Sequence, residues 1–269
     1  MLPIIVQSST IRCMPADFLT LPGRPAKPRS TGLTHVLDKG MPAPDVRALL
    51  DSTDHFIDIW KFGWGTAYLD RQFEEKLALL AEHGVRACLG GTLLEIAWSQ
   101  GRVEEYFRWA ARAGVPLVEV SCGVMPIAAS DKARLISRAT QSFAVLTEVG
   151  SKDPARQMQP AQWAQEVSDD LACGAWLVVT EGRESGTVGT YDESGGVLED
   201  IIDAVVVAAG HERILFEAPR KDQQAWLINR FGPSVNLGNI ALADIVGVEA
   251  LRLGLRADTA PVPMRVPAW

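Results

Sequence analysis

The chain alternates eight short apolar runs with segments of helical spacing, and this alternation limits the folds it can adopt. The runs are rich in β-branched residues and occupy 33–38, 56–62, 86–91, 116–121, 143–149, 176–181, 214–219 and 234–238. Between them, segments such as 71–84 place apolar residues on one helical face. Strands that alternate with helices pair in parallel through right-handed crossovers. We therefore predict a (β/α)8 TIM-type barrel, which chains of about 250 residues commonly form.

The predicted barrel is a single domain that spans residues 31–259. An open doubly wound sheet is the alternative, but no GxGxxG motif follows the first run. Residues 1–30 contain several prolines and basic residues, which favours an extended N-terminal arm that packs across the barrel. Residues 260–269 are also rich in proline, and we predict an irregular C-terminal tail there.

Composition narrows the class of protein. Apolar residues make up 47% of the 269-residue chain, yet no apolar run approaches the roughly 18–20 residues of a membrane span. The net charge of −7 disfavours nucleic acid and anionic membranes as partners. The four cysteines lack the spacing of a zinc site, and the first residues lack the basic segment of a signal peptide. We therefore expect reduced thiols and a cytoplasmic protein.

Charged side chains gather at the C-terminal ends of the predicted strands, where the chemistry of TIM barrels takes place. Asp58, Glu119 and Glu217 even lie between apolar neighbours within the runs. A buried carboxylate is costly unless it is paired or binds a cation. Basic residues near the strand ends are available as partners, namely Lys39, Lys61, Lys152, Arg183 and Lys221. Together these acids and bases predict one site that holds a divalent metal and an anionic substrate.

Glycine-containing turns follow two of the predicted strands, at 90–92 and 237–239. Where such a turn opens a helix, its backbone N–H groups can bind phosphate or carboxylate, although glycine also serves simply to make a tight turn. In many TIM barrels the phosphate site lies after the seventh and eighth strands. In this chain that place corresponds to Lys221 and to the segment 236–239. We find no Ser/His/Asp or Cys/His arrangement that would indicate a nucleophile.

The chain resembles the phosphosulfolactate synthase family in a series of motifs that runs in order through about residues 25–260 and involves all eight predicted units. The motifs are GLTHVLDKG at 32–40, FIDIWKFGWGT at 56–66, GGTLLE at 90–95, EVS at 119–121, LTEVGSK at 146–152, EGRESG at 181–186, FEAP at 216–219, VNLGNI at 235–240 and LRLGLRADT at 251–259. The resemblance implies a TIM-type barrel that adds sulfite to C3 of phosphoenolpyruvate, with Mg²⁺, to give (2R)-phospho-3-sulfolactate. In methanogens this reaction begins a route to coenzyme M. The resemblance also implies small anionic substrates and a homo-oligomer, with trimers described in the family.

The resemblance further implies roles for individual residues. The family's proposed proton donor is the second lysine of an EVGKK motif, and this position is Lys152, in EVGSK. Glu148 is the second catalytic candidate, as an orienting or a ligating residue beside Lys152, and Lys61 is the third. The sequence does not choose among the metal candidates Asp58, Glu95, Glu119, Glu148 and Glu181. The candidates for substrate binding are Lys39, Arg183, Lys221, Arg220, Asn236, Asn239, Gly91 and Thr92.

The chain departs from the family pattern at four positions. Ser151 replaces the first lysine of EVGKK, and Cys122 replaces the Asn or Asp after EVS. Arg220 and Asp222 replace neutral residues after FEAP, and Arg220 would restore the positive charge lost at Ser151. These changes leave two alternatives open. One is a related barrel enzyme that adds a different nucleophile to phosphoenolpyruvate or to another enol phosphate. The other is a non-catalytic, stress-associated barrel.

Overall fold

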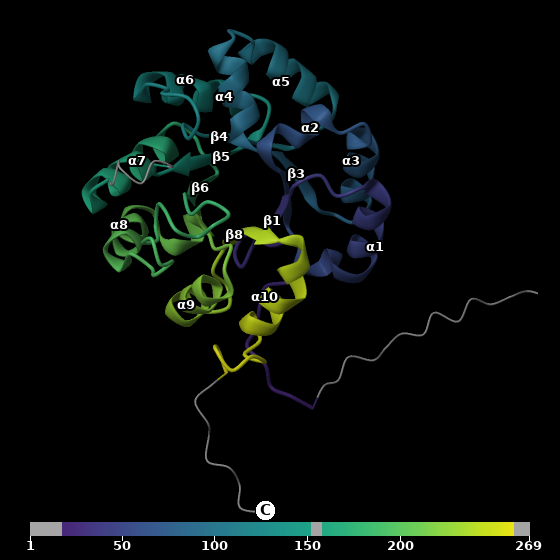
Figure 1. The fold of residues 1–269 in the computed structure, drawn as a ribbon, viewed down its shortest axis with the longest axis vertical. Coiled ribbons are helices and arrows are strands. Elements are labelled where there is room, and N and C mark those ends of the chain that lie inside the picture. The colour runs from purple at the N-terminus through teal and green to yellow at the C-terminus, as the bar shows by residue number, and fades with distance from the viewer. Residues whose placement is uncertain (1–17, 152–157, 261–269) are drawn as a thin grey trace, which may run out of the picture.

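The computed structural model describes residues 18–151 and 158–260, and it confirms the predicted fold. Eight parallel strands close into a barrel in the order β1 to β8, and helices surround it (Figure 1). The strands are β1 (Thr34–Asp38), β2 (Ile59–Phe62), β3 (Arg86–Leu89), β4 (Leu117–Val120), β5 (Ala144–Val149), β6 (Leu177–Thr180), β7 (Ile214–Glu217) and β8 (Leu237–Ala241).

Helices cover the outside of the barrel between successive strands. In the described part of the chain the α-helices are α1 (Ala43–Thr53), α2 (Thr66–Leu69), α3 (Phe73–Glu82), α4 (Gly91–Ser99), α5 (Val103–Arg112), α6 (Ala129–Ala139), α7 (Pro160–Ala172), α8 (Glu199–Ala209), α9 (Lys221–Phe231) and α10 (Ile245–Arg252). Short 3₁₀ helices are η1 (Asp54–Phe56), η2 (Gly63–Gly65), η3 (His211–Arg213) and η4 (Leu242–Asp244). None of these helices combines the length and the apolar character that crossing a lipid bilayer requires.

The interior of the barrel is built in layers. A strand directs successive side chains to opposite faces, so residues two positions apart share the interior. The layer nearer the N-terminal ends is apolar and includes Leu33, Ile59, Cys88, Leu117, Leu146, Leu177 and Leu215. Two positions further along, four of these strands carry the buried residues Lys61, Glu119, Glu148 and Glu217. A charged layer therefore lies above the apolar one, at the C-terminal ends of the strands.

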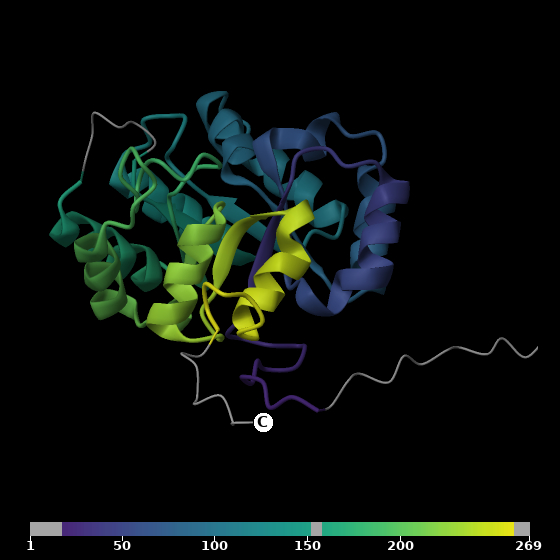
Figure 2. The ribbon, with the colours of Figure 1, turned by 60° about the horizontal axis from the view of Figure 1, so that its bottom comes forward.

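Residues 18–32 run beneath the N-terminal ends of the strands, as the purple segment of Figure 2 shows. The guanidinium of Arg24 forms ion pairs with Asp58 and Glu249, and Arg29 pairs with Asp58 at 3.0 Å. These contacts cover this end of the barrel with matched charges. The predicted limits of the N-terminal arm and the C-terminal tail stay predictions, because residues 1–17 and 261–269 lie outside the described part.

Two strands begin later than the sequence predicts. The run 56–62 contains the end of η1 and then β2, which begins at Ile59. The last strand begins at Leu237 and continues to Ala241, instead of occupying 234–238. Asp58 and Asn236 therefore precede their strands and do not end them. These shifts decide at which end of the barrel the two side chains lie.

Candidate active site

A cavity of about 490 Å³ opens at the C-terminal ends of the strands. Its polar wall comes from the seven strands β2 to β8 and the segments that follow them, and consists chiefly of Lys61, Gly91, Thr92, Glu119, Glu148, Glu181, Arg183, Glu217 and Asn239. Known TIM-barrel enzymes carry their active sites at this end. The cavity is therefore the candidate active site, and it gathers most of the residues predicted from the sequence.

Lys61 is a central cation of this cavity. Its Nζ lies 2.8 Å from Glu119 Oε2 and 3.6 Å from Glu217 Oε1, and all three side chains are buried. Burial alone would lower the pKa of Lys61, but attraction to Glu119, Glu217 and Glu148 outweighs it and raises the pKa. Lys61 therefore stays protonated at neutral pH. It can stabilise negative charge on a bound molecule, but it gives up its proton reluctantly.

Glu217 lines the cavity although the predicted site omitted it. Its Oε2 accepts a hydrogen bond of 3.0 Å from the Gly182 N–H. Burial raises the pKa of Glu217 to about 7; Lys61 opposes this rise, and Glu148 and Glu119 add to it. The signal for Glu217 was its position between apolar neighbours in the seventh run, which marks a side chain inside the barrel.

The first turn of α4 faces the cavity through Gly91 and Thr92. The Gly91 N–H donates a 2.9 Å hydrogen bond to Glu119 Oε1, so this carboxylate joins the helix terminus to Lys61. A side chain at position 91 would overlap Ser121, which explains the glycine. The structure thus brings together three residues that the sequence placed in different units.

Glu181 and Arg183 bound the cavity beyond the end of β6. The Arg183 N–H donates a 2.7 Å hydrogen bond to Glu181 Oε1. Arg183 has a φ of 51°, a conformation that residues other than glycine adopt uncommonly and that is concentrated at functional sites. Both residues belong to the site predicted from the EGRESG motif.

Asn239 is held in the cavity wall by His35. Asn239 also has a positive φ, 51°, and its N–H donates a 3.2 Å hydrogen bond to His35 Nδ1. Burial, and next the charge of Lys61, lower the pKa of His35 well below its usual value, so the ring is neutral and can accept this bond. The Asn239 Oδ1 is buried, and within residues 18–151 and 158–260 it has no hydrogen-bond partner. The Asn239 Oδ1 is therefore available to accept a hydrogen bond from a ligand.

Glu95 does not fit its predicted role as a metal ligand. It is fully buried, and its carboxylate accepts hydrogen bonds from the Ser121 hydroxyl and from the N–H groups of Gly123, Val124 and Met125. Four donors occupy the capacity of one carboxylate. Glu95 instead fixes the loop that follows β4.

Asp58 and Asn236 lie at the opposite end of the barrel, which corrects their predicted roles. Asp58 Oδ2 accepts a 2.9 Å hydrogen bond from the Thr34 N–H at the start of β1. Asn236 Oδ1 accepts one of 3.0 Å from the Leu33 N–H, and its amide donates to the Ile214 carbonyl at 3.1 Å. Because each residue precedes its strand, neither can contribute a metal ligand or a substrate contact at the mouth.

Lys221 and Arg220 do not line the cavity, which corrects the phosphate site predicted after β7. Lys221 Nζ pairs with Asp258 at 2.8 Å. Arg220 donates a 2.8 Å hydrogen bond to the Ser194 carbonyl and pairs with Asp222 at 3.3 Å. Lys221 thus pairs with a neighbouring loop, and Arg220 has partners both in a neighbouring loop and in the first turn of α9.

Lys39 lies at the rim of the cavity. Its Nζ pairs with Glu184 at 2.5 Å and lies 5.0 Å from the centre of the Trp64 ring, and both partners line the cavity. The Lys39 side chain is 46% exposed, so a long-range attraction for anions is the role its position allows.

Lys152 lies outside the described residues, so its role as proton donor stays a prediction. Glu148, four positions earlier in the sequence, lines the cavity from β5. In the described ranges no group of three or more His, Cys, Asp or Glu side chains is arranged to hold a metal ion by itself. The metal candidates that remain at the cavity are Glu119, Glu148 and Glu181.

Comparison with known proteins decides the family. A model of the (2R)-phospho-3-sulfolactate synthase family matches residues 22–258. The chain belongs to this family. The phosphosulfolactate synthase of Methanothermobacter thermautotrophicus is 43% identical over 249 residues, which cover 90% of this chain and 96% of the relative. The phosphosulfolactate synthase of Bacillus subtilis is 40% identical over 247 residues, which cover 90% of this chain and 98% of the relative.

Comparison with solved structures supports the architecture. A crystal structure of a 3-hexulose-6-phosphate synthase has a TM-score of 0.51 and covers 85% of this chain and 95% of its own. Its sequence is 14% identical to this chain, so the likeness shows the barrel fold alone. The assignment to a synthase family therefore rests on the sequence relatives.

Proposed function

We propose that the chain catalyses the Mg²⁺-dependent addition of sulfite to C3 of phosphoenolpyruvate, which forms (2R)-phospho-3-sulfolactate. The observation that carries the proposal is the charged cavity at the strand ends of a chain from this family. Phosphoenolpyruvate bears a phosphate at one end and a carboxylate at the other. Arg183 and the first turn of α4 can bind the phosphate. Lys61 can bind the carboxylate, and the Asn239 side chain can donate to it through Nδ2.

The carboxylates of the cavity create the need for an added cation. The ionisable groups that line it are two bases and five acids, namely Lys61, Arg183, Glu119, Glu148, Glu181, Glu184 and Glu217. This excess of negative charge repels phosphoenolpyruvate unless a cation enters with it. Mg²⁺ usually takes one or two protein carboxylates and fills its remaining positions with substrate oxygens and water. The residues fit Mg²⁺ on that basis, with Glu148 and Glu181 on the neighbouring units β5 and β6 as its protein ligands.

The proton balance of the reaction gives Lys61 and Lys152 different roles. When sulfite attacks C3, the electron pair of the double bond moves to C2, and negative charge spreads onto the substrate carboxylate. Bound Mg²⁺ supplies electrostatic stabilisation of that charge. Lys61 contributes to the same stabilisation, because the surrounding carboxylates hold its pKa high. C2 then takes one proton, and we assign its delivery to Lys152, from the EVGSK motif.

The test is phosphorus NMR of the purified protein with phosphoenolpyruvate, sulfite and Mg²⁺. We expect a new phosphate-ester resonance that appears only when both sulfite and Mg²⁺ are present and that disappears with a chelator. A folded protein that leaves the spectrum unchanged would contradict the proposal. A product that forms with another nucleophile in place of sulfite would identify a related enzyme that uses the same cavity for a different addition.

A further inference from the structure

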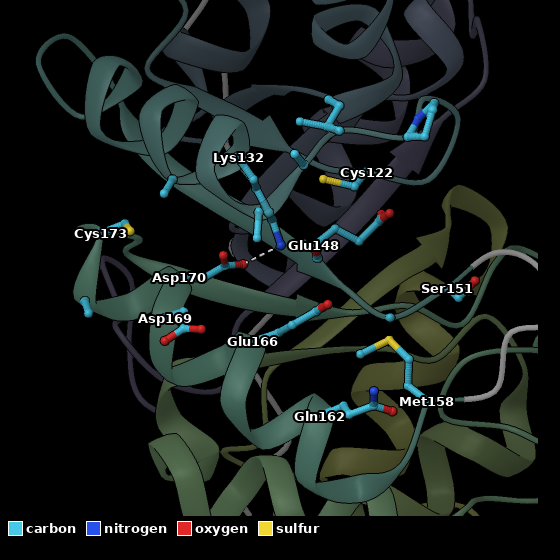
Figure 3. Close-up of a pocket in the computed structure, with 17 residues that line it drawn as sticks. Cys122, Lys132, Glu148, Ser151, Met158, Gln162, Glu166, Asp169, Asp170 and Cys173 are labelled. Carbon is cyan, nitrogen blue, oxygen red and sulfur yellow. Dashed lines mark hydrogen bonds and ion pairs between the residues drawn. The ribbon is translucent and has the colours of Figure 1, made fainter.

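Lys132 of α6 is a buried lysine outside the cavity of the candidate active site. Its Nζ lies 2.7 Å from Asp170 Oδ2 of α7, and it donates a 2.9 Å hydrogen bond to the main-chain carbonyl of Glu148. Only 8% of Lys132 and 5% of Asp170 is exposed. Figure 3 shows the Lys132 amine directed at Asp170, while the Glu148 side chain extends away from this pair.

The ammonium group of this lysine takes the place of a backbone N–H donor that β4 would supply if it continued. Successive carbonyls of a strand point to opposite neighbours, and the Val149 carbonyl accepts the Glu181 N–H on the β6 side. The Glu148 carbonyl therefore points to the β4 side. Pairing of β4 with β5 ends there at Val120 and Thr147, and beyond it β4 gives way to a loop. The lysine thus supplies a donor that β4 no longer supplies.

Helix α7 also packs against the residue that follows β5. Gly150 has a φ of 107°, and a Cβ there would overlap the buried indole of Trp163. Burial raises the pKa of Glu166, with Lys132 and the Gly150 N–H acting in the opposite direction. Trp163, Glu166 and Asp170 are spaced three and four residues apart, so they share one face of α7. This single face contacts the end of β5.

A cavity borders this end of β5 on the side of α6 and α7. This second cavity, of about 700 Å³, lies between α6 and α7 and is lined by Glu148, Gly150 and Ser151 together with Lys132 and residues of both helices. Side chains that border a cavity have fewer packing contacts than side chains in a filled core. The ion pair and the carbonyl hydrogen bond therefore carry more of the positioning than they would in a filled core.

We propose that Lys132 and Asp170, with Trp163, form a clamp that positions the end of β5 and thereby the Glu148 carboxylate in the active site. The effect on rate rests on the proposed function, whereas the effect on the strand end does not. Apolar side chains of similar size often replace a buried ion pair without loss of stability. They cannot provide the donor that the Glu148 carbonyl uses, so orientation is what the charged pair adds.

The test compares three variants of the full-length protein. In Lys132→Met/Asp170→Leu we expect kcat to fall by about 10- to 100-fold, as misplacement of an active-site group does, with KM for phosphoenolpyruvate within about threefold. Lys132→Arg keeps the charge and the donors and should recover most of kcat. Arg138→Met/Glu104→Leu removes an exposed ion pair between α6 and α5, bonded at 2.7 Å, and should leave kcat unchanged.

Hydrogen exchange provides the readout that does not depend on the reaction. In Lys132→Met/Asp170→Leu the amides of residues 146–151 should exchange faster, and in the Arg138 control they should not. If the wild-type protein has no synthase activity, the proposed function fails, and exchange still decides the clamp. A folded double variant with unchanged exchange at 146–151, or with wild-type kcat in an active enzyme, would overturn the clamp.

Discussion

At the N-terminal end of the barrel, Asp58 pairs with Arg24 at 3.2 Å and Arg29 at 3.0 Å beneath the strands. At the C-terminal end, Lys61 pairs with Glu119 and Glu217 in the wall of a cavity of about 490 Å³. Both groups of charges are buried. The first is covered by residues 18–32, whereas the second faces open space.

The difference between the two ends is one of charge balance and access. At the first end, Arg24 and Arg29 of the arm form ion pairs with Asp58, which precedes β2, and Arg24 also pairs with Glu249 of α10. At the second end, carboxylates outnumber the cations, and no arm covers them in the described residues. Charge that is matched locally stabilises a fold, whereas an excess beside a cavity attracts a ligand of opposite sign. We therefore expect the first end to serve stability and the second to serve the proposed reaction.

Removing the central cation of the cavity should have the largest effect. We expect Lys61→Met to lower kcat/KM for phosphoenolpyruvate by about 10³-fold, because it removes charge stabilisation from the reacting end of the substrate. The matched control is Lys76→Met, since Lys76 is also a buried lysine but pairs with Asp38 and Asp70. Steady-state kinetics on the folded fraction of each variant decide the case. Equal losses of kcat/KM in Lys61→Met and Lys76→Met would contradict a specific role of Lys61 in the reaction.

Removing the acid at the other end should affect stability instead. Asp58→Ala leaves Arg24 and Arg29 buried without this partner, and we expect the free energy of unfolding to fall by about 3–5 kcal/mol. Urea denaturation measures this change, and kcat/KM should stay within about threefold of wild type. Lost activity with unchanged stability would return Asp58 to the metal role that the sequence suggested.

The pH dependence of stability sharpens the comparison at Glu217. The folded state raises the pKa of Glu217 from 4.5 to about 7, so it binds this proton more tightly than the unfolded state does. The resulting stabilisation is complete below the lower value and is lost as the pH rises through the higher one. It amounts to as much as about 3 kcal/mol, at about 1.4 kcal/mol per pKa unit. In the wild type, urea denaturation should show a free energy of unfolding that falls between about pH 4.5 and about pH 8, and Glu217→Gln should remove this fall. An unchanged fall in the variant would contradict the assignment.

The smallest effect is expected just outside the cavity. Lys221 belongs to the C-terminal end of the barrel, but it is 49% exposed and pairs with Asp258. Lys221→Ala should change kcat/KM by less than about twofold and stability by less than about 1 kcal/mol, as exposed ion pairs do. A loss of kcat/KM of tenfold or more would extend the active site to the loop after β7.

Periodicity predicted the barrel because eight alternations of strand and helix leave few other arrangements. It also placed Lys61, Glu119 and Glu148 at the mouth of the barrel, since each stands near the C-terminal end of a predicted strand. It failed where a shift of about three residues changes the end of the barrel, as it does for Asp58 and Asn236. Periodicity also does not show which hydrogen-bond donors fill a carboxylate.

Glu95 and His35 illustrate that last point. Glu95 looked like a metal ligand until its four donors, contributed by the loop after β4, were visible. His35 lies in the first predicted strand, and its bond to the Asn239 N–H joins residues 204 positions apart. Contacts of this kind depend on the closure of the barrel, which local sequence patterns do not encode.

A crystal structure of the protein with phosphoenolpyruvate and Mg²⁺, in the absence of sulfite, tests the central claim most directly. The account predicts that the substrate lies in the cavity at the C-terminal end, with its phosphate near Arg183 and the first turn of α4, and its carboxylate near Lys61 and Asn239. Phosphoenolpyruvate bound elsewhere, whether between α6 and α7 or at the arm-covered end, would contradict it.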